Sequence, residues 1–308
     1  MGVSVLQRVF SSEVLARLEK VQRPQPSPWD DAGIPIRERH HIVQLTGPSP
    51  SPARWARRNA WDRYLRAASA CRLLDDELLS RLRDRDDDLF RGAMAECLVA
   101  WFFLRRRRME VVPRPDGSAT KNVDLAIRGE GLEVATEVKA PFVPRTHSSW
   151  NGSDEDAILK SLRKAGTQCK GGRPNLVVLV PILRSHVFNQ RHQLINATIG
   201  ERVLIVPVSL DGSPPEPERA GFNQNGHLAK LWRQPQGPFR TVLTRVSAVL
   251  SIEEGFAHRG GNLHIGHWVV AVHNPFAAHP IPPQFFGRIP QWIVRDGMMG
   301  WSDKYRGI

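Results

Sequence analysis

The strongest constraint on the fold is a pair of alternating segments on either side of residues 129–131, which read Gly-Glu-Gly. Apolar and polar side chains alternate along each segment, which is the pattern of a strand with one face toward a core. A Gly-rich turn between two such segments is typical of a β-hairpin. We therefore predict two antiparallel strands, Val123–Arg128 and Leu132–Ala140, joined by a tight turn.

The two-residue period predicts which side chains share the polar face of this hairpin. Glu137 and Lys139 lie on that face of the second strand, and Asp124 lies on it in the first. A turn of two or four residues places Asp124 opposite Ala135 or Glu137, so the two carboxylates come within about 4.5–8 Å at Cβ. Carboxylates this close repel each other unless a positive charge lies between them. Mg²⁺ suits such a gap, because it is usually bound by one or two carboxylates together with phosphate and water.

Lys139 points to the same side as Glu137 and could orient a water molecule or neutralise charge on a phosphate. Only eight of the 43 basic residues are Lys, so a compact ammonium at this position suggests a specific need. The small residues Ala126 and Ala135 leave room for a substrate. The alternative is a solvent-facing hairpin on which Glu137 and Lys139 form an ordinary surface ion pair.

Helices are predicted before and after the hairpin. The first runs from Asp88 to about Arg107, and a short strand, Met109–Val112, follows it. The second runs from about Asp154 to Lys170, with Ser153 as its N-cap. Further strands are predicted at 176–181, 203–208, 246–252 and 267–272, with a helix at about 185–198.

This order predicts an α/β fold with a mixed central sheet flanked by helices. An N-terminal basic helical region, from about Ala53 to Asp87, precedes it and follows a Pro-rich stretch at 22–52. We divide the chain into residues 1–86 as the N-terminal region, 87–280 as the α/β domain and 281–308 as a C-terminal tail.

With these elements in place, the chain resembles the PD-(D/E)XK nuclease superfamily, whose members have the restriction-endonuclease-like fold. The matching residues are Asp124 and the triplet Glu137-Val138-Lys139, and the resemblance covers about residues 88–275. It implies that Asp124, Glu137 and the backbone carbonyl of Val138 hold the metal and that Lys139 assists the attacking water. The Pro that precedes the first Asp in the family is Val123 here, so the match rests on its structural context.

The resemblance also implies roles for two helices. Glu96, on the helix ahead of the hairpin, would bind the metal, directly or through water, or would orient Lys139. Because Glu96 begins an apolar run, it needs a buried partner, and an ion pair with Arg91 or with an Arg of the basic region is the alternative. On the following helix one face carries three residues that the resemblance implies contact nucleic acid: Lys160, Lys164 and Gln168.

Composition favours a polyanionic partner, because the net charge is +12 and the sequence pI is about 10.4. The longest apolar run, Cys97–Leu104, is far shorter than the roughly 20 residues that span a bilayer. With no secretory signal and an odd number of cysteines, we expect a cytoplasmic protein that does not contact membranes.

Two other motifs have ordinary structural explanations. His264-Ile265-Gly266-His267 has the letters of a nucleotide-binding motif of aminoacyl-tRNA synthetases, but a strand-like segment follows it and we interpret it as a turn entering a strand. Trp55 and Trp61, near Arg57 and Arg58, could bind nucleic acid by stacking, and packing of an amphipathic helix explains the two Trp residues about as well.

The sequence therefore predicts a Mg²⁺-dependent endonuclease, with Mn²⁺ as a substitute, that hydrolyses phosphodiester bonds of nucleic acid, DNA in preference to RNA. Restriction, repair and phage defence are all compatible roles, and so is a homodimer. The alternatives are a catalytically inactive nucleic-acid-binding module of the same fold and an Arg-rich interaction protein.

Overall fold

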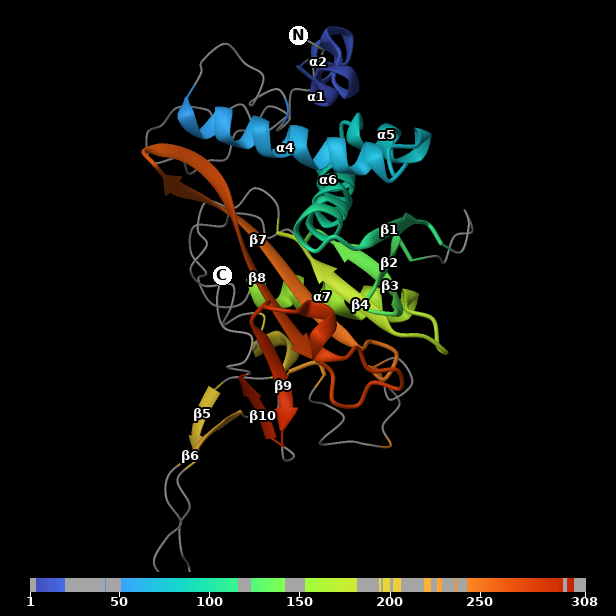
Figure 1. Ribbon diagram of the computed structural model, residues 1–308, viewed down its shortest axis with the longest axis vertical. Coiled ribbons are helices and arrows are strands. Elements are labelled where there is room, and N and C mark those ends of the chain that lie inside the picture. The colour runs from blue at the N-terminus through green and yellow to red at the C-terminus, as the bar shows by residue number, and fades with distance from the viewer. Residues whose placement is uncertain are drawn as a thin grey trace, which may run out of the picture.

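The computed structural model describes most of the chain, with several gaps. The described residues are 4–19, 42, 51–115, 123–141, 153–181, 194, 196–199, 202–205, 219–222, 226–228, 236, 243–295 and 298–301. Within them the chain forms a mixed sheet with helices on both faces, which confirms the predicted α/β class (Figure 1). No helix among these residues is both long and apolar enough to cross a membrane. Most of the helix predicted at 185–198 lies outside them.

Eight of the described strands form the main sheet, in the order β1-β2-β3-β4-β7-β8-β9-β10. β1 to β3 are antiparallel, β3, β4 and β7 are parallel, and β8 is antiparallel to β7 and parallel to β9. The bounds are β1 Glu110–Pro113, β2 Leu125–Gly129, β3 Leu132–Lys139, β4 Asn175–Leu179, β7 Ala248–Arg259, β8 Asn262–His273, β9 Gln291–Arg295 and β10 Met298–Trp301. The strand predicted at 203–208 is β5, Arg202–Ile205, which pairs with β6, Arg219–Phe222, in a separate sheet.

The basic N-terminal region is interrupted, whereas the sequence predicts helical structure along its whole length. Instead of one helical stretch it forms two helices, and the chain turns between them at Arg72, whose φ is 61°. Asp75 then starts the second helix by accepting a hydrogen bond from the backbone N–H of Leu78 at 2.9 Å. The helices of the described chain are α1 Val5–Val9, α2 Ser12–Glu19, α4 Pro52–Ala70, α5 Asp76–Leu82, α6 Asp87–Trp101 with its π-helical extension η1 Phe102–Arg106, α7 Ser153–Gln168 and the 3-10 helix η2 Pro283–Phe286.

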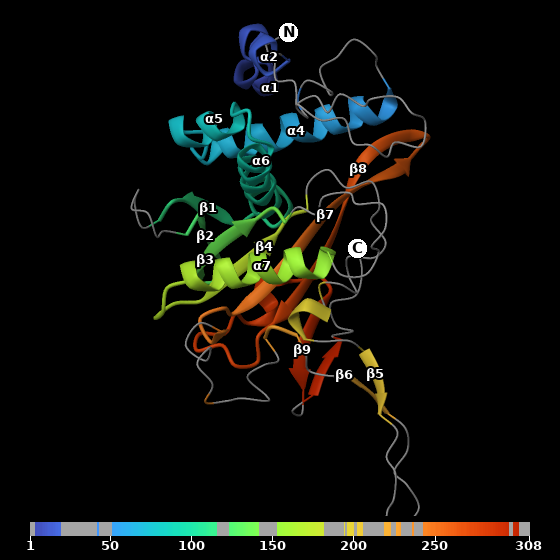
Figure 2. The same cartoon turned by 180° about the vertical axis from the view of Figure 1, so that it is seen from behind.

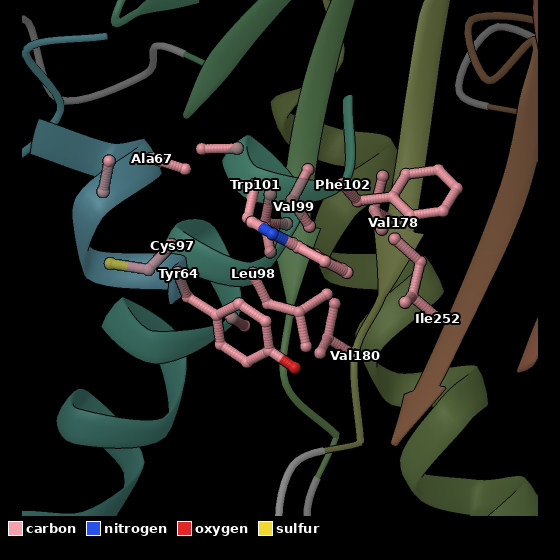
Figure 3. Packing of buried hydrophobic residues seen from close by; sticks show 14 of the residues in the cluster. Tyr64, Ala67, Cys97, Leu98, Val99, Trp101, Phe102, Val178, Val180 and Ile252 are labelled. Carbon is pink, nitrogen blue, oxygen red and sulfur yellow. The ribbon is translucent and has the colours of Figure 1, made fainter. Parts of the chain in front are cut away.

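The helices cover opposite faces of the sheet. α6 lies on one face and α7 on the other, as the two views of the molecule show (Figures 1 and 2). Alternate residues of β4 follow this division, because Val178 packs in the core beside α6 and Val177 packs in the core beside α7. Figure 3 shows the core on the α6 side, where Tyr64 of α4 and Trp101 of α6 lie among strand residues.

Residues 281–308, set apart above as a tail, contribute to the main sheet and its core. β9 pairs with β8 in parallel, and Phe285 and Phe286 of η2 are completely buried in the same core as α4 and α6. The N-terminal helices share this core as well, because Trp61 and Leu65 of α4 belong to it. The described parts of all three segments are therefore packed together.

Candidate active site

The turn of the β2–β3 hairpin fixes which residues face each other. Leu125 pairs with Thr136, and Gly129 pairs with Leu132, so the loop has two residues. These are Glu130, with φ 52°, and Gly131, with φ 72°. Two successive positive φ values are typical of a type I′ turn, whose twist matches that of the strands. Continuing the register by one residue beyond Leu125 brings Asp124 opposite Glu137.

The side chains on the polar face of this hairpin contact one another. The backbone N–H of Val138 donates to Asp124 Oδ2 at 2.7 Å, and Lys139 Nζ forms an ion pair with Glu137 Oε1. The side chain of Glu137 is completely buried and that of Lys139 is 16% exposed. Glu137 Oε2 is buried and has no hydrogen-bond partner among the described residues. The pair is therefore enclosed and does not resemble a solvated surface ion pair.

Burial makes both carboxylates hard to ionise, and repulsion by Asp124 adds to this effect for Glu137. Burial, with a smaller contribution from the Asp124 charge, raises the pKa of Glu137 to about 7. Burial also raises the pKa of Asp124, although Lys139 and the bond from Val138 act against this. Two neighbouring carboxyls with raised pKa values can be held ionised together by an added positive charge.

Glu96 approaches this pair from the other face of the sheet. It is buried in α6, and Arg81 Nη2 of α5 donates to its Oε1 at 2.6 Å. Burial raises the pKa of Glu96 to about 8, and the Asp124 charge adds to the shift while Arg81 opposes it. The partner of Glu96 is therefore an arginine of the basic region, which is one of the two alternatives from the sequence. The other alternative, Arg91, pairs with Asp88.

Two arginines near the site were not identified individually from the sequence. Arg81 lowers the pKa of Asp124 as well as that of Glu96, so its positive charge lies close to the carboxylates. Arg114, just after β1, also acts on Asp124 and pairs with Asp75 and Glu77 of the α5 segment, the latter at 3.3 Å. The only sequence signal for Arg81 is the unmatched carboxylate of Glu96, because the two residues lie on different helices.

The residues predicted on α7 lie at different depths. Lys160 and Lys164 are exposed, and Gln168 is partly buried with an Oε1 atom that has no hydrogen-bond partner among the described residues. Lys164 lowers the pKa of Glu137, which indicates that its charge lies near the hairpin. Cys169, directly after α7, is buried, and burial raises the pKa of its thiol to about 12, with the Glu137 charge adding to the shift. It therefore borders the site as a neutral group.

The donor set suits a hard cation with a partial protein shell. Among the described residues no group of three or more His, Cys, Asp or Glu side chains is arranged to hold a metal ion. Two carboxylates, Asp124 and Glu137, are nevertheless adjacent, and Glu137 Oε2 lacks a partner. Mg²⁺ commonly takes one or two carboxylates and completes its shell with waters and substrate phosphate. The residues present therefore fit a magnesium site of this kind and do not form an all-protein cage.

A second buried polar cluster lies between α4 and β8. Tyr64 Oη donates to Glu254 Oε1 at 2.6 Å and lies 2.6 Å from His267 Nε2. The hydroxyl has only one proton to donate. When it donates a hydrogen bond to Glu254, Nε2 of His267 must donate one to Oη. Burial lowers the pKa of His267 to about 3, which keeps the imidazole neutral. All four residues of the motif His264–His267 lie within β8, so the motif is part of a strand and does not form the turn that enters it.

Comparisons with known proteins found no similar protein. No protein-family model matches the chain, and neither a curated protein nor a solved structure matches it. What the protein does is therefore inferred from its own residues and their contacts.

Proposed function

We propose that this protein is a divalent-metal-dependent nuclease that hydrolyses phosphodiester bonds of nucleic acid, with DNA preferred over RNA. One observation carries the proposal: Asp124 and Glu137 occupy facing positions of one hairpin, in an enclosed site that also holds Lys139. A site that forces carboxylates together at a cost in free energy is characteristic of function. Phosphodiester chemistry needs the groups assembled here, namely oxygen ligands for a cation and an amine near the attacked phosphorus.

The arrangement of elements supports a restriction-endonuclease-like core for this site. The chain passes from α6 through the antiparallel strands β1, β2 and β3 to α7, and then to β4, which is parallel to β3. This is the order of helix, hairpin, helix and buried strand on which the resemblance to the PD-(D/E)XK superfamily rests. In a core of this kind, Asp124 and the Glu137-Val138-Lys139 triplet would occupy the positions of that superfamily's motif.

Each residue has a distinct role in this proposal. Asp124 and Glu137, with the backbone carbonyl of Val138, would hold Mg²⁺ or Mn²⁺. A bound cation would supply electrophilic stabilisation of the phosphate and a lowered pKa for its water. Lys139 orients the attacking water and neutralises negative charge that develops on the phosphate.

The residues on the two helices support these roles. Lys164, whose charge acts on Glu137, would contact the phosphate next to the cleaved bond, and Gln168 offers a polar atom without a described partner on the same side of α7. Glu96 adds a third acid close to the site from the opposite face, and its carboxyl group pairs with Arg81. The guanidinium of Arg81 also offsets part of the negative charge of Glu96 and Asp124.

One observation favours a second candidate, a nucleic-acid-binding module without catalysis. Glu96 is already paired with Arg81, so its carboxylate has a structural explanation that needs no metal. This reading does not account for the facing carboxylates of Asp124 and Glu137. It predicts binding of DNA with no cleavage under any metal condition.

Nicking of supercoiled plasmid DNA, followed with separate additions of Mg²⁺, Mn²⁺, Ca²⁺ and EDTA, tests the proposal. We expect cleavage with Mg²⁺ and Mn²⁺, binding without appreciable cleavage in Ca²⁺, and no cleavage in EDTA. Undiminished cleavage in EDTA would overturn the metal mechanism. Binding without cleavage in every condition would establish the inactive module. A parallel assay with single-stranded RNA of the same sequence measures the preference for DNA.

A further inference from the structure

The two Trp residues of α4 that the sequence could not distinguish have different environments. Trp61 is completely buried in the core, whereas Trp55 is 61% exposed. Core packing therefore explains Trp61 and leaves Trp55 unexplained. Among the described residues only two other large apolar side chains are similarly exposed, Leu89 and Phe256, each at 42%.

α4 presents Trp55 on a strongly basic surface. The helix contains five arginines and one aspartate. Its buried residues, among them Ala60, Tyr64 and Ala67, define the face that packs on the sheet and α6. The opposite face carries four exposed residues at positions i, i+4, i+8 and i+11, namely Trp55, Asn59, Arg63 and Arg66.

The tip of the long β7–β8 hairpin lies beside the N-terminal half of α4 (Figure 1). The guanidinium of Arg57, on α4, lies 5.2 Å from the centre of the exposed Phe256 ring on β7. His258 and Arg259, which follow on the same strand, are exposed as well. Trp55, on the outer face of α4, and Phe256, at the hairpin tip, thus lie near the same end of the helix, and each has cationic side chains close to it in the chain or in space.

We propose that this surface, formed by the N-terminal half of α4 and the β7–β8 tip, binds single-stranded nucleic acid. An exposed aromatic ring among arginines is the pairing that stacks an unpaired base and binds the phosphates on either side of it. A duplex keeps its bases stacked inside and offers only phosphates to such a surface. The surface shares its class of partner with the proposed nuclease site but none of its residues, so it stands independently of cleavage.

Binding of a labelled oligothymidylate to the full chain in EDTA, followed by fluorescence anisotropy, tests this surface with no contribution from cleavage. Trp55→Ala should weaken the affinity about tenfold, because stacking on one aromatic side chain supplies that order of free energy. Trp55→Phe should restore most of the loss. Arg58→Gln should reduce the slope of log affinity against log salt by about 0.7, the value for one phosphate contact on a single strand.

Leu89→Ala is the matched control, because it removes an exposed apolar side chain away from this surface. We expect it to leave the affinity for oligothymidylate unchanged. Wild-type affinity in Trp55→Ala, or an equal loss for oligothymidylate and for a duplex, would overturn the proposal. The same holds if vesicles rich in phosphatidylserine bind through Trp55 while oligothymidylate does not bind, since the surface would then be a membrane contact. Because plasmid nicking is measured separately, a protein that cleaves but fails this test retains the proposed function.

Discussion

Two of the buried polar clusters among the described residues hold their charges in different ways. One, which we call the carboxylate cluster, consists of Glu96, Asp124 and Glu137 with Arg81 and Lys139. The other, the tyrosine cluster, consists of Tyr64, Glu254 and His267. Both join elements that are far apart in the sequence, and both contain a buried carboxylate oxygen without a hydrogen-bond partner among the described residues.

The clusters differ in how many like charges are enclosed. In the carboxylate cluster burial raises the pKa values of all three acids and the Asp124 charge adds to the shifts of Glu96 and Glu137, while Arg81 and Lys139 oppose these shifts only in part. In the tyrosine cluster a single carboxylate accepts a hydrogen bond from a neutral hydroxyl, which a neutral imidazole supports. The first arrangement stores repulsion that a bound cation would relieve, whereas the second fixes α4 on the sheet. We infer that the clustered like charges favour a site for chemistry, whereas one carboxylate hydrogen-bonded by a tyrosine favours a structural contact.

The largest expected effect is on catalysis and separates the clusters most clearly. Lys139→Ala should lower single-turnover cleavage of DNA by about 10³-fold, since it removes the group that positions the water and offsets phosphate charge. Calorimetric metal binding should persist, because Lys139 is not a ligand. Lys139→Arg should recover little, as a planar guanidinium cannot replace a compact ammonium. Cleavage at the wild-type rate in Lys139→Ala would remove the hairpin from the active site.

The pH dependence of stability should have opposite signs for Glu96 in the carboxylate cluster and His267 in the tyrosine cluster. Glu96 has a pKa of about 8 in the folded protein and an ordinary value of 4.5, so stability in EDTA should fall as pH rises from 4.5 to about 8. His267 has a folded pKa of about 3 against an ordinary 6.5, so its contribution is lost as pH falls from 6.5 toward 3.

Urea unfolding of matched variants isolates these two contributions. The stability of Glu96→Gln relative to wild type should increase as pH rises from 4.5 to 8. For His267→Phe the relative stability should increase as pH falls below 6.5. Difference curves that stay flat over both ranges would show that neither group titrates as its environment indicates.

How much of this could be predicted from sequence depends on how local each pattern is. The hairpin and its two faces are predictable, because alternation and a Gly-rich turn are set by neighbouring residues. The facing of Asp124 and Glu137 follows from that register. The break between α4 and α5 at Arg72 was missed, because the basic stretch has helical spacing on both sides of it.

Contacts between distant segments could not be predicted in the same way. Arg81 is one of 35 arginines, and nothing around it in the sequence marks it as the partner of Glu96. Tyr64 and His267 are separated by 203 positions and meet only because α4 lies across β8. Trp61 is buried and Trp55 is exposed because the sheet covers only one face of α4. Tertiary packing decided each of these, and local propensity contains no information about it.

A smaller effect should come from opening the tyrosine cluster. Tyr64→Phe removes the hydroxyl that joins Glu254 to His267 and leaves both without that partner in a buried place. We expect a loss of about 2 kcal/mol in the free energy of unfolding, the usual cost of an unsatisfied buried polar group. Plasmid nicking by the folded variant should match wild type. A large loss of nicking at unchanged stability would show that this cluster serves the chemistry as well.

The smallest expected effect is a gain in stability, and it tests the stored repulsion directly. Glu137→Gln replaces a buried carboxylate whose pKa is raised to about 7 by an uncharged side chain of nearly the same shape. At pH 8 in EDTA this should raise the free energy of unfolding by about 1 kcal/mol, because the lost attraction to Lys139 is smaller than the desolvation and repulsion removed.

Glu133→Gln is the matched control for this gain, since Glu133 lies on the same face of β3 but is exposed and pairs with Arg128 at 2.5 Å. Its change in stability should be within about 0.5 kcal/mol of zero, as for other exposed ion pairs. Saturating Mg²⁺ should reverse the order, stabilising wild type but not Glu137→Gln, because only the carboxylate binds the cation strongly. If Glu137→Gln is instead less stable than wild type in EDTA, the ion pair with Lys139 outweighs the repulsion. The carboxylate cluster would then be a structural contact like the tyrosine cluster, and the distinction between the two would fail.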